Sequence, residues 1–207
     1  MKNSRPEVFI IESNSWRDEE DNRREGVALR EMLALSEKRC KYVYLRTRRE
    51  FRIALEQFTS SRYRYLHLAC HGDGHGLHLT IDYLPFSHVY SLLRPHMDDR
   101  RLFVSACKGV KKGLAIPLLR NTNCFSVIGP RHDIFFSDSA AIWASFYSLM
   151  FKSDEQKMKS HDIRERLGAL CQLFGVYFNS YFTSAEPPYW HYRRLGPDTV
   201  SLPVRGG

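Results

Sequence analysis

Two stretches decide the fold: HLACHG at residues 67–72 and LFVSACKG at residues 102–109. Each begins as a short apolar run and ends at a reactive side chain closely followed by glycine, His71 in the first stretch and Cys107 in the second. Apolar runs bounded in this way are typical of buried strands in a parallel sheet. Open α/β sheets bind ligands beyond the carboxyl ends of such strands. Neighbouring strands would therefore bring an imidazole and a thiol to one crevice, the pair that a cysteine nucleophile with a histidine base requires.

The composition is that of a folded domain. Of the 207 residues, 43% are hydrophobic and 13% aromatic, which suffices for one sizeable core. We expect a single domain over residues 1–207, with flexible ends at 1–6 and 199–207. No apolar run approaches the roughly 18 residues of a membrane span, so we expect no membrane contact. The five cysteines are odd in number and form no CxxC pair, which favours a reducing cytoplasm over a disulfide framework.

Strand and helix signals alternate along the chain. This alternation predicts right-handed βαβ units and a mostly parallel sheet with helices on both faces. We expect the strands at residues 8–11, 42–45, 65–70, 102–106, 125–128 and, as an edge strand, 189–195. Thr47 and Glu50 form a capping box that opens one helix, and a short hairpin is expected over 77–84. Ser137 is expected to cap another helix, and the last long helix is expected to carry apolar residues at helical spacing from Ile163 to Tyr181.

The surroundings of Cys107 favour a thiolate. We expect this residue at the start of a helix, where unpaired N–H groups attract an anion. Three lysines follow within five residues, and Gly109 leaves room for a substrate backbone. Positive potential of this kind activates a thiol. The alternative is a buried structural cysteine, which is our interpretation of Cys70 and Cys124 because they lie inside or beside apolar strands.

Gly72 has an expected role beside His71. Its N–H group, with that of Cys107, could point at the oxyanion that develops during acyl transfer. The segment also contains several histidines, which raises the possibility of zinc. Zinc needs about four converging donors, whereas His67 and His71 would lie about 13 Å apart along a regular strand. We therefore expect neither a metal nor an organic cofactor.

These residues resemble the caspase-like cysteine peptidases of clan CD, whose members carry a His-Gly and an Ala-Cys at adjacent strand ends. Within that group the chain looks most like the CHAT domains. Three further stretches agree, namely SVIGPRHDIFFSDSAAIWASFYSLMF, HDIRERLGALCQLF and PPYWHYRRLGPD. The resemblance covers about residues 7–198 and implies an α/β three-layer sandwich, with a six-stranded sheet in the order 2-1-3-4-5-6. One departure is that Arg131 and His132 stand near the place of a tryptophan often found after the family's fifth strand.

The resemblance implies a cysteine endopeptidase that cleaves a protein substrate, with His71 as general base and Cys107 as nucleophile. CHAT domains usually work beside sensor or scaffold modules, often in bacterial defence, so the resemblance also implies an activating partner. Two other classes stay open. One is a catalytically degenerate CHAT-like module that binds proteins. The other, raised by the net charge of +8, is a basic nucleic-acid-associated regulator. No nucleic-acid-binding motif accompanies that charge, so we expect nucleic acid to take part only indirectly.

Charges of both signs are available to hold P1, the substrate residue before the scissile bond. Asp133 and Asp138 lie where relatives that cleave after basic residues place pocket acids, although Asp138 would also stabilise a first helical turn. The stretch Arg24-Glu25-Gly26 resembles the Arg-x-Gly with which caspases hold an acidic side chain, although a solvated helix start explains it as well. Basic and acidic P1 residues both stay open, and the basic one is favoured.

Overall fold

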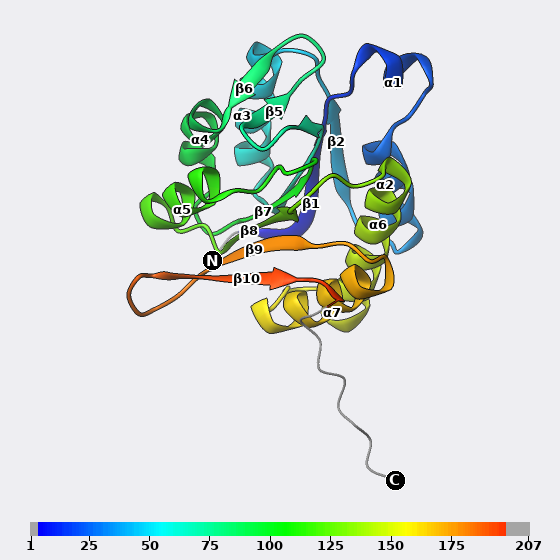
Figure 1. Cartoon of the computed structure of the whole chain (residues 1–207). Coiled ribbons are helices and arrows are strands. Elements are labelled where there is room, and N and C mark those ends of the chain that lie inside the picture. Colours follow the sequence, from blue (N-terminus) through cyan, green and yellow to red (C-terminus); the bar gives the residue numbers. More distant parts are fainter. Residues whose placement is uncertain (1–3, 198–207) are drawn as a thin grey trace.

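Seven strands form the central sheet in the computed structural model, which describes residues 4–197. Their spatial order is β2-β1-β3-β7-β8-β9-β10 (Figure 1). The strands are β1 (Arg5–Glu12), β2 (Cys40–Tyr44), β3 (Tyr63–Ala69), β7 (Arg101–Ser105), β8 (Ser126–Pro130), β9 (Phe178–Thr183) and β10 (Trp190–Leu195). The pairs among β2, β1, β3, β7 and β8 are all parallel, and β9 and β10 add an antiparallel edge.

Helices cover both faces of this sheet (Figure 1). They are α1 (Trp16–Glu20), α2 (Glu25–Leu35), α3 (Arg48–Ser61), α4 (Phe86–Leu93), α5 (Lys112–Asn121), α6 (Phe136–Ser153) and α7 (Ser160–Leu173), with a 3-10 turn at Arg94–His96. A small antiparallel sheet of β4 (His71–Gly72), β5 (Gly76–His78) and β6 (Tyr83–Pro85) follows β3. No helix within residues 4–197 combines the length and the apolar character that crossing a lipid bilayer requires.

Alternate residues of the central strands enter two separate cores, because successive side chains of a strand point to opposite faces. Phe9 and Ile11 pack with the side chains of α3, α4 and α5, whereas Val8 and Ile10 pack with those of α2, α6 and α7. A strand buried on both faces has a continuous apolar sequence. This property explains why the parallel strands could be predicted from short apolar runs, and the expected α/β class is confirmed.

The predicted six-stranded order is wrong because residues 178–183 form a strand. We expected the last helix to continue to Tyr181, but α7 ends at Leu173 and Gly175 follows with φ of +66°. Glycine adopts this left-handed conformation readily and commonly terminates helices. The chain then returns as β9 between β8 and β10. Phe178 and Phe182 pack on the α6 and α7 side, and Tyr181 packs on the opposite side.

Two further local expectations are wrong. Cys107 does not begin a helix: the chain turns after β7, with the Gly109 N–H donating to the Ala106 carbonyl and Lys108 at φ of +53°, and α5 begins only at Lys112. Ser137 does not cap α6, which begins one residue earlier without a side-chain cap. By contrast, the capping box at Thr47 and the hairpin of β5 and β6 are present as predicted.

Candidate active site

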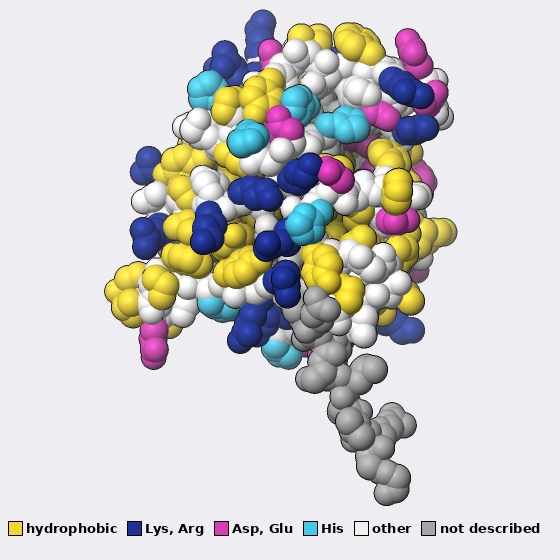
Figure 2. Space-filling view, in the orientation of Figure 1, with side chains coloured by type: hydrophobic (Ala, Val, Ile, Leu, Met, Phe, Trp, Pro, Cys, Tyr) yellow, Lys and Arg dark blue, Asp and Glu magenta, His cyan; other side chains and the backbone are white. Residues whose placement is uncertain are grey.

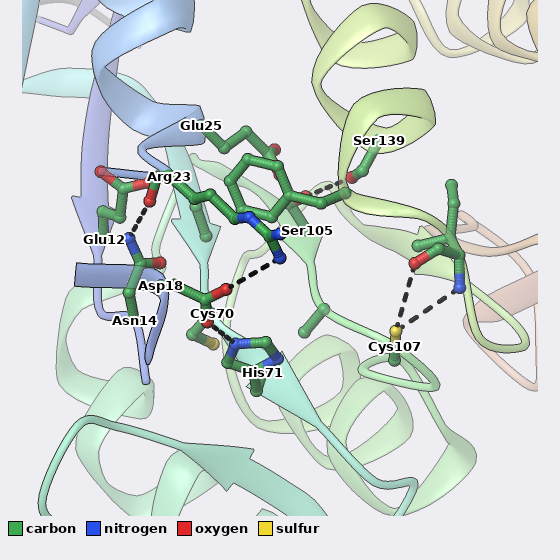
Figure 3. A pocket seen from close by; sticks show the side chains of 14 residues that line it. Glu12, Asn14, Asp18, Arg23, Glu25, Cys70, His71, Ser105, Cys107 and Ser139 are labelled. Atoms are coloured by element: carbon green, nitrogen blue, oxygen red, sulfur yellow. Dashed lines mark hydrogen bonds and ion pairs between the residues drawn. The ribbon is translucent and has the colours of Figure 1, made fainter. Parts of the chain in front are cut away.

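His71 and Cys107 lie beyond the carboxyl ends of two neighbouring parallel strands. Ala69 at the end of β3 pairs with Ser105 at the end of β7, and each reactive residue follows its strand by two positions. Both side chains line one cavity of about 160 Å³ (Figure 3). Cys107 is half-buried, and 48% of the His71 side chain is exposed. Both groups are therefore accessible from one opening.

Gly72 allows the two strand ends to approach. A Cβ atom at this position would lie 2.6 Å from the Cys107 carbonyl oxygen and 3.2 Å from the Ala106 Cβ. The first distance is shorter than van der Waals contact. The clashing atom belongs to the backbone, which cannot relieve the clash by a rotamer change as a long side chain could. The chain that leaves β3 can therefore pass over the Cys107 turn only because residue 72 has no side chain.

Asp18 holds the His71 ring in place. Its Oδ2 accepts a hydrogen bond from His71 Nε2 at 2.6 Å (Figure 3), and its other oxygen lies 3.7 Å from an Arg23 nitrogen. Burial raises the pKa of Asp18, but hydrogen bonds from Ser15 and His71 outweigh that effect and keep the pKa below its ordinary value of 3.8. An ionised carboxylate only accepts hydrogen bonds, so Nε2 carries the proton. In the neutral imidazole, Nδ1 then has the free lone pair that a general base uses.

The sequence did not single out Asp18. It lies in α1, a short helix for which we stated no expectation, and the Ser15 hydroxyl caps this helix by accepting from the Asp18 N–H. A serine three residues before an acidic residue is a helix-start pattern, so the helix itself could have been found. Its orientation towards His71 had no signal in the sequence.

The Cys107 sulfur is bonded to the backbone of Ile134. It accepts from the Ile134 N–H at 3.4 Å and lies 3.6 Å from the Ile134 carbonyl oxygen, to which the thiol donates. In Figure 3 the His71 ring is turned towards Asp18, whereas the bonds from the sulfur run the other way. No hydrogen bond joins His71 to Cys107 in the described residues.

The backbone at Cys107 offers one donor for an oxyanion. Within residues 4–197 the Cys107 N–H has no hydrogen-bond partner, whereas the next amide, that of Lys108, donates to the His132 carbonyl at 3.2 Å. Gly72, the other expected donor, lies in β4 opposite Leu77 of β5. An unpaired amide beside a nucleophile is the feature that stabilises a tetrahedral oxyanion.

The other cysteines have the properties of structural thiols. Cys70 lines the same cavity as Cys107, but burial raises its pKa to about 12, so it stays protonated at neutral pH. Burial likewise raises the pKa of Cys124 and Cys171 to about 12 and that of Cys40 to about 11. Because the thiolate is the nucleophilic form, Cys70 is not a candidate nucleophile, and Cys107 is the other cysteine that lines the cavity.

Three carboxylates line the cavity: those of Glu12, Asp18 and Glu25. Glu25 is 5% exposed, and its Oε1 has no hydrogen-bond partner among the described residues. The nearest basic group is the buried His67, whose Nε2 lies 3.6 Å away and is likewise without a hydrogen bond. A buried carboxylate oxygen without a partner is costly, and it marks a place where a cationic group would be stabilised.

Glu12 is satisfied within the fold. It is fully buried and accepts hydrogen bonds from the Tyr42 hydroxyl at 2.6 Å and the Gly26 N–H at 2.9 Å. Burial nevertheless raises the pKa of Glu12 above its ordinary value. Glu12 thus fixes the entry into α2, which begins with Glu25, and thereby places Glu25 at the cavity.

The three residues expected to select P1 lie outside the cavity lining. Asp133 is exposed and pairs with Lys108 at 2.7 Å. Asp138 lies in the first turn of α6, where it accepts from the Ser137 hydroxyl. The Arg24 guanidinium packs 4.3 Å from the centre of the Tyr44 ring. The neighbouring Arg23 lies at the cavity instead (Figure 3).

The described residues contain no group of three or more His, Cys, Asp or Glu side chains arranged to hold a metal ion. His67, which we considered as a zinc donor, is buried against Trp143 and Tyr147 of α6. Its Nδ1 lies 3.2 Å from the Tyr147 hydroxyl. His67 and His71 therefore face different surroundings.

Comparison with solved structures places this fold among known ones. A secreted C11 cysteine protease from Bacteroides thetaiotaomicron, solved with an irreversible peptide inhibitor, matches over 87% of this chain with a TM-score of 0.53 and 10% identity. The chain spans 66% of the length of that protease chain. Protein GSU0716 from Geobacter sulfurreducens matches over 92% of this chain and 94% of its own, with a TM-score of 0.44 and 10% identity.

No protein-family model matches this sequence, and a search of the curated proteins finds no similar sequence. At 10% identity, the likeness to the C11 protease shows the fold alone. This chain thus has an α/β fold like that of the C11 cysteine protease, with a mostly parallel central sheet, as we expected at this coarse level.

We predict that Gly72→Ala separates the two strand ends. The added Cβ would meet the Cys107 carbonyl at 2.6 Å, so the backbone must shift, and we expect the melting temperature to fall by several degrees. Gly113→Ala is the matched control, because a Cβ there meets nothing within 4 Å and lies in α5; it should be neutral or stabilising. Differential scanning fluorimetry measures both, and equal melting temperatures for the two variants would contradict this role of Gly72.

Asp18→Asn should lower stability in a pH-dependent way. The pKa of Asp18 is lower in the folded chain than in the unfolded chain. Its contribution to the free energy of unfolding is therefore fully present at a pH above its pKa in the unfolded chain, and it is lost as the pH falls through its pKa in the folded chain. In urea unfolding at pH 6, the free energy of unfolding should therefore be lower for the variant than for the original chain. This difference should disappear as the pH falls below 3.8, the ordinary pKa of an aspartate. A difference that persists unchanged at the lowest pH would rule out the ionised pair as its source.

Proposed function

We propose that this chain is a caspase-like cysteine endopeptidase, most similar to the CHAT domains, that cleaves proteins through His71 and Cys107. One observation supports this most strongly: both side chains line one cavity at the ends of neighbouring parallel strands, and an ionised carboxylate orients the imidazole. The likeness in fold to a C11 cysteine protease is consistent with it.

In the proposed mechanism, Asp18 keeps the proton on His71 Nε2, so that Nδ1 accepts the proton of the Cys107 thiol. The thiolate attacks the scissile carbonyl carbon, and the Cys107 and Gly72 N–H groups donate to the resulting oxyanion. His71 then returns the proton to the leaving amine as the C–N bond breaks. Water, deprotonated by the same imidazole, finally hydrolyses the thioester and restores the thiol.

An activating partner remains part of the proposal. In this structure the Cys107 thiol forms hydrogen bonds with the backbone of Ile134. These bonds connect the turn after β7 with the loop before α6. A sensor or scaffold protein that moved the loop of Ile134 would free the sulfur to reach His71. The association with bacterial defence rests on the resemblance to CHAT domains.

Neither alternative class has a specific supporting observation. A degenerate module would not need to retain both His71 and Cys107 at one cavity. A nucleic-acid-associated regulator would need its cations on one face, but Lys and Arg side chains on the face in Figure 2 are spread over several elements, with hydrophobic and acidic side chains between them.

A covalent probe tests the nucleophile. A peptidyl acyloxymethyl ketone should add its mass to Cys107, and Cys107→Ala and His71→Ala should each abolish both labelling and cleavage while leaving the fold intact. Cys70→Ala is the matched control, because its thiol lines the same cavity and stays protonated; it should retain labelling and lose on the order of 1 kcal/mol of stability. Labelling that disappears with Cys70 but persists without Cys107 would overturn the assignment.

The same proposal includes a preference for a basic P1 side chain. The carboxylates at the cavity outnumber the cations, and Glu25, which lines the cavity and has an oxygen without a hydrogen-bond partner, would hold a guanidinium or ammonium group. Inside a protein such a pair discriminates much better than one in water. An acidic P1 side chain would instead be held by Arg23, which already faces Asp18 and Asp21 at 3.7 and 3.4 Å.

A positional P1 peptide library distinguishes these cases. Glu25→Gln should lower kcat/KM for Arg or Lys at P1 by about 10- to 100-fold, as expected for loss of a buried charged partner. Asp133→Asn, Asp138→Asn and Arg24→Ala should leave the preference unchanged, because these side chains lie outside the cavity lining. A preference for Asp or Glu that is lost in Arg23→Ala would show that the pocket selects the opposite charge.

A further inference from the structure

A second cavity lies at the opposite end of the central sheet. It has a volume of about 360 Å³ and is lined by Arg64, Tyr65, Arg101, Phe125, Lys157, Met158, Lys159, Ser160 and His161. Tyr65 and Arg101 pair near the amino ends of β3 and β7, the strands whose carboxyl ends lead to His71 and Cys107. By strand rise the two ends are about 20 Å apart, so this cavity is separate from the candidate active site.

The charge of this cavity is uncompensated. Arg64, Arg101, Lys157 and Lys159 line it, and no Asp or Glu does so within the described chain. The carboxylate of Asp154, on the same segment, accepts from backbone amides of residues 156 and 157, and Asp162 pairs with His161.

Arg101 is the central group. It is only 7% exposed, its guanidinium bonds to the hydroxyls of Ser126 at 3.0 Å and Ser160 at 3.3 Å, and it forms no ion pair within residues 4–197. Burial lowers the pKa of Arg101 to about 10, which still leaves it charged at neutral pH. Hydroxyl groups orient a guanidinium without neutralising it. A buried cation without an anionic partner is costly in a fold, and an anion in the cavity would remove this cost.

The start of α7 adds backbone donors at the same place. This 14-residue helix begins at Ser160 beside the cavity, and its first turn has no side-chain cap. The first intrahelical bond runs from the Ile163 N–H to the Lys159 carbonyl. Unpaired N–H groups at a helix start bind anions, phosphate in particular. The buried Arg101 and the helix start therefore point to the same type of ligand.

We propose that this cavity binds a small phosphate monoester. A phosphate dianion suits the planar donors of Arg101 and the point charges of Lys157 and Lys159. The cavity is larger than inorganic phosphate requires, and its apolar side chains, Phe125 and Met158, can contact an organic group attached to the phosphate. A nucleoside monophosphate is one such ester, since it joins a phosphate to an organic group that Phe125 and Met158 can contact.

Isothermal titration calorimetry on the full chain tests this proposal at fixed ionic strength, with adenosine monophosphate, ribose 5-phosphate, inorganic phosphate and adenosine as probes. We expect the two organic phosphates to bind, inorganic phosphate to compete with them, and adenosine not to bind. Calorimetry measures binding without any peptidase assay. A failure to bind phosphate esters would therefore contradict this proposal alone and would leave the proposed peptidase activity unaffected.

Variants locate the binding. The double variant Lys157→Ala/Lys159→Ala changes exposed side chains and should weaken adenosine monophosphate binding at least 10-fold, and Arg101→Met should abolish it. Lys152→Ala, an exposed lysine of α6 outside the cavity, should bind as the original chain does. If Arg101→Met does not fold, the double variant still decides the question. Binding of adenosine as tight as that of its monophosphate, no binding of any phosphate at millimolar concentration, or an unchanged affinity in the double variant would each overturn the proposal.

Discussion

The candidate site depends on the approach of two backbone segments, that of Gly72 and that of Cys107. The parallel pairing of β3 with β7 brings the two strand ends level, from Tyr65 opposite Arg101 to Ala69 opposite Ser105. Beyond these ends the chains would normally diverge, but the absence of a side chain at Gly72 lets one pass over the carbonyl of the other. The proposed covalent mechanism requires its groups within a few ångströms of each other, and this approach of the two backbones is what would bring His71 and Cys107 together.

Three adjacent parallel strands each contribute one member of the site. Asp18 follows β1, His71 follows β3 and Cys107 follows β7, and these strands are neighbours in the sheet. The strands are buried, whereas each candidate side chain lies in the connection that follows its strand. The sheet therefore fixes the edge at which the candidate site lies, and the connections determine which atoms meet there.

The sequence predicted the parallel strands well, because burial on both faces makes each of them a continuous apolar run. It did not predict β9, because the apolar residues of that strand also continue the helical spacing of α7. Phe174 and Tyr181 fitted the helical period, although Gly175 between them provided a stop signal that would have separated α7 from β9. At the site, His71, Gly72 and Cys107 could be found because each adjoins a strand. Asp18 and Glu25 could not be assigned to the site, because their positions depend on contacts between distant segments: Asp18 bonds to His71, and Glu12 of β1 holds the start of α2. No local pattern encodes such contacts.

The charges at the two ends of the sheet are opposite. The cavity at the carboxyl ends is lined by three carboxylates, whereas the one at the amino ends is lined by two arginines and two lysines. The net charge of +8 would oppose the approach of a basic substrate only weakly, because charges more than about 8 Å apart are largely screened at physiological ionic strength. In both proposals, recognition at contact would depend on desolvated groups, Glu25 in one cavity and Arg101 in the other, for which screening is small. A basic protein can therefore select a cation at one end of its sheet and an anion at the other, since each buried charge acts only within its own cavity.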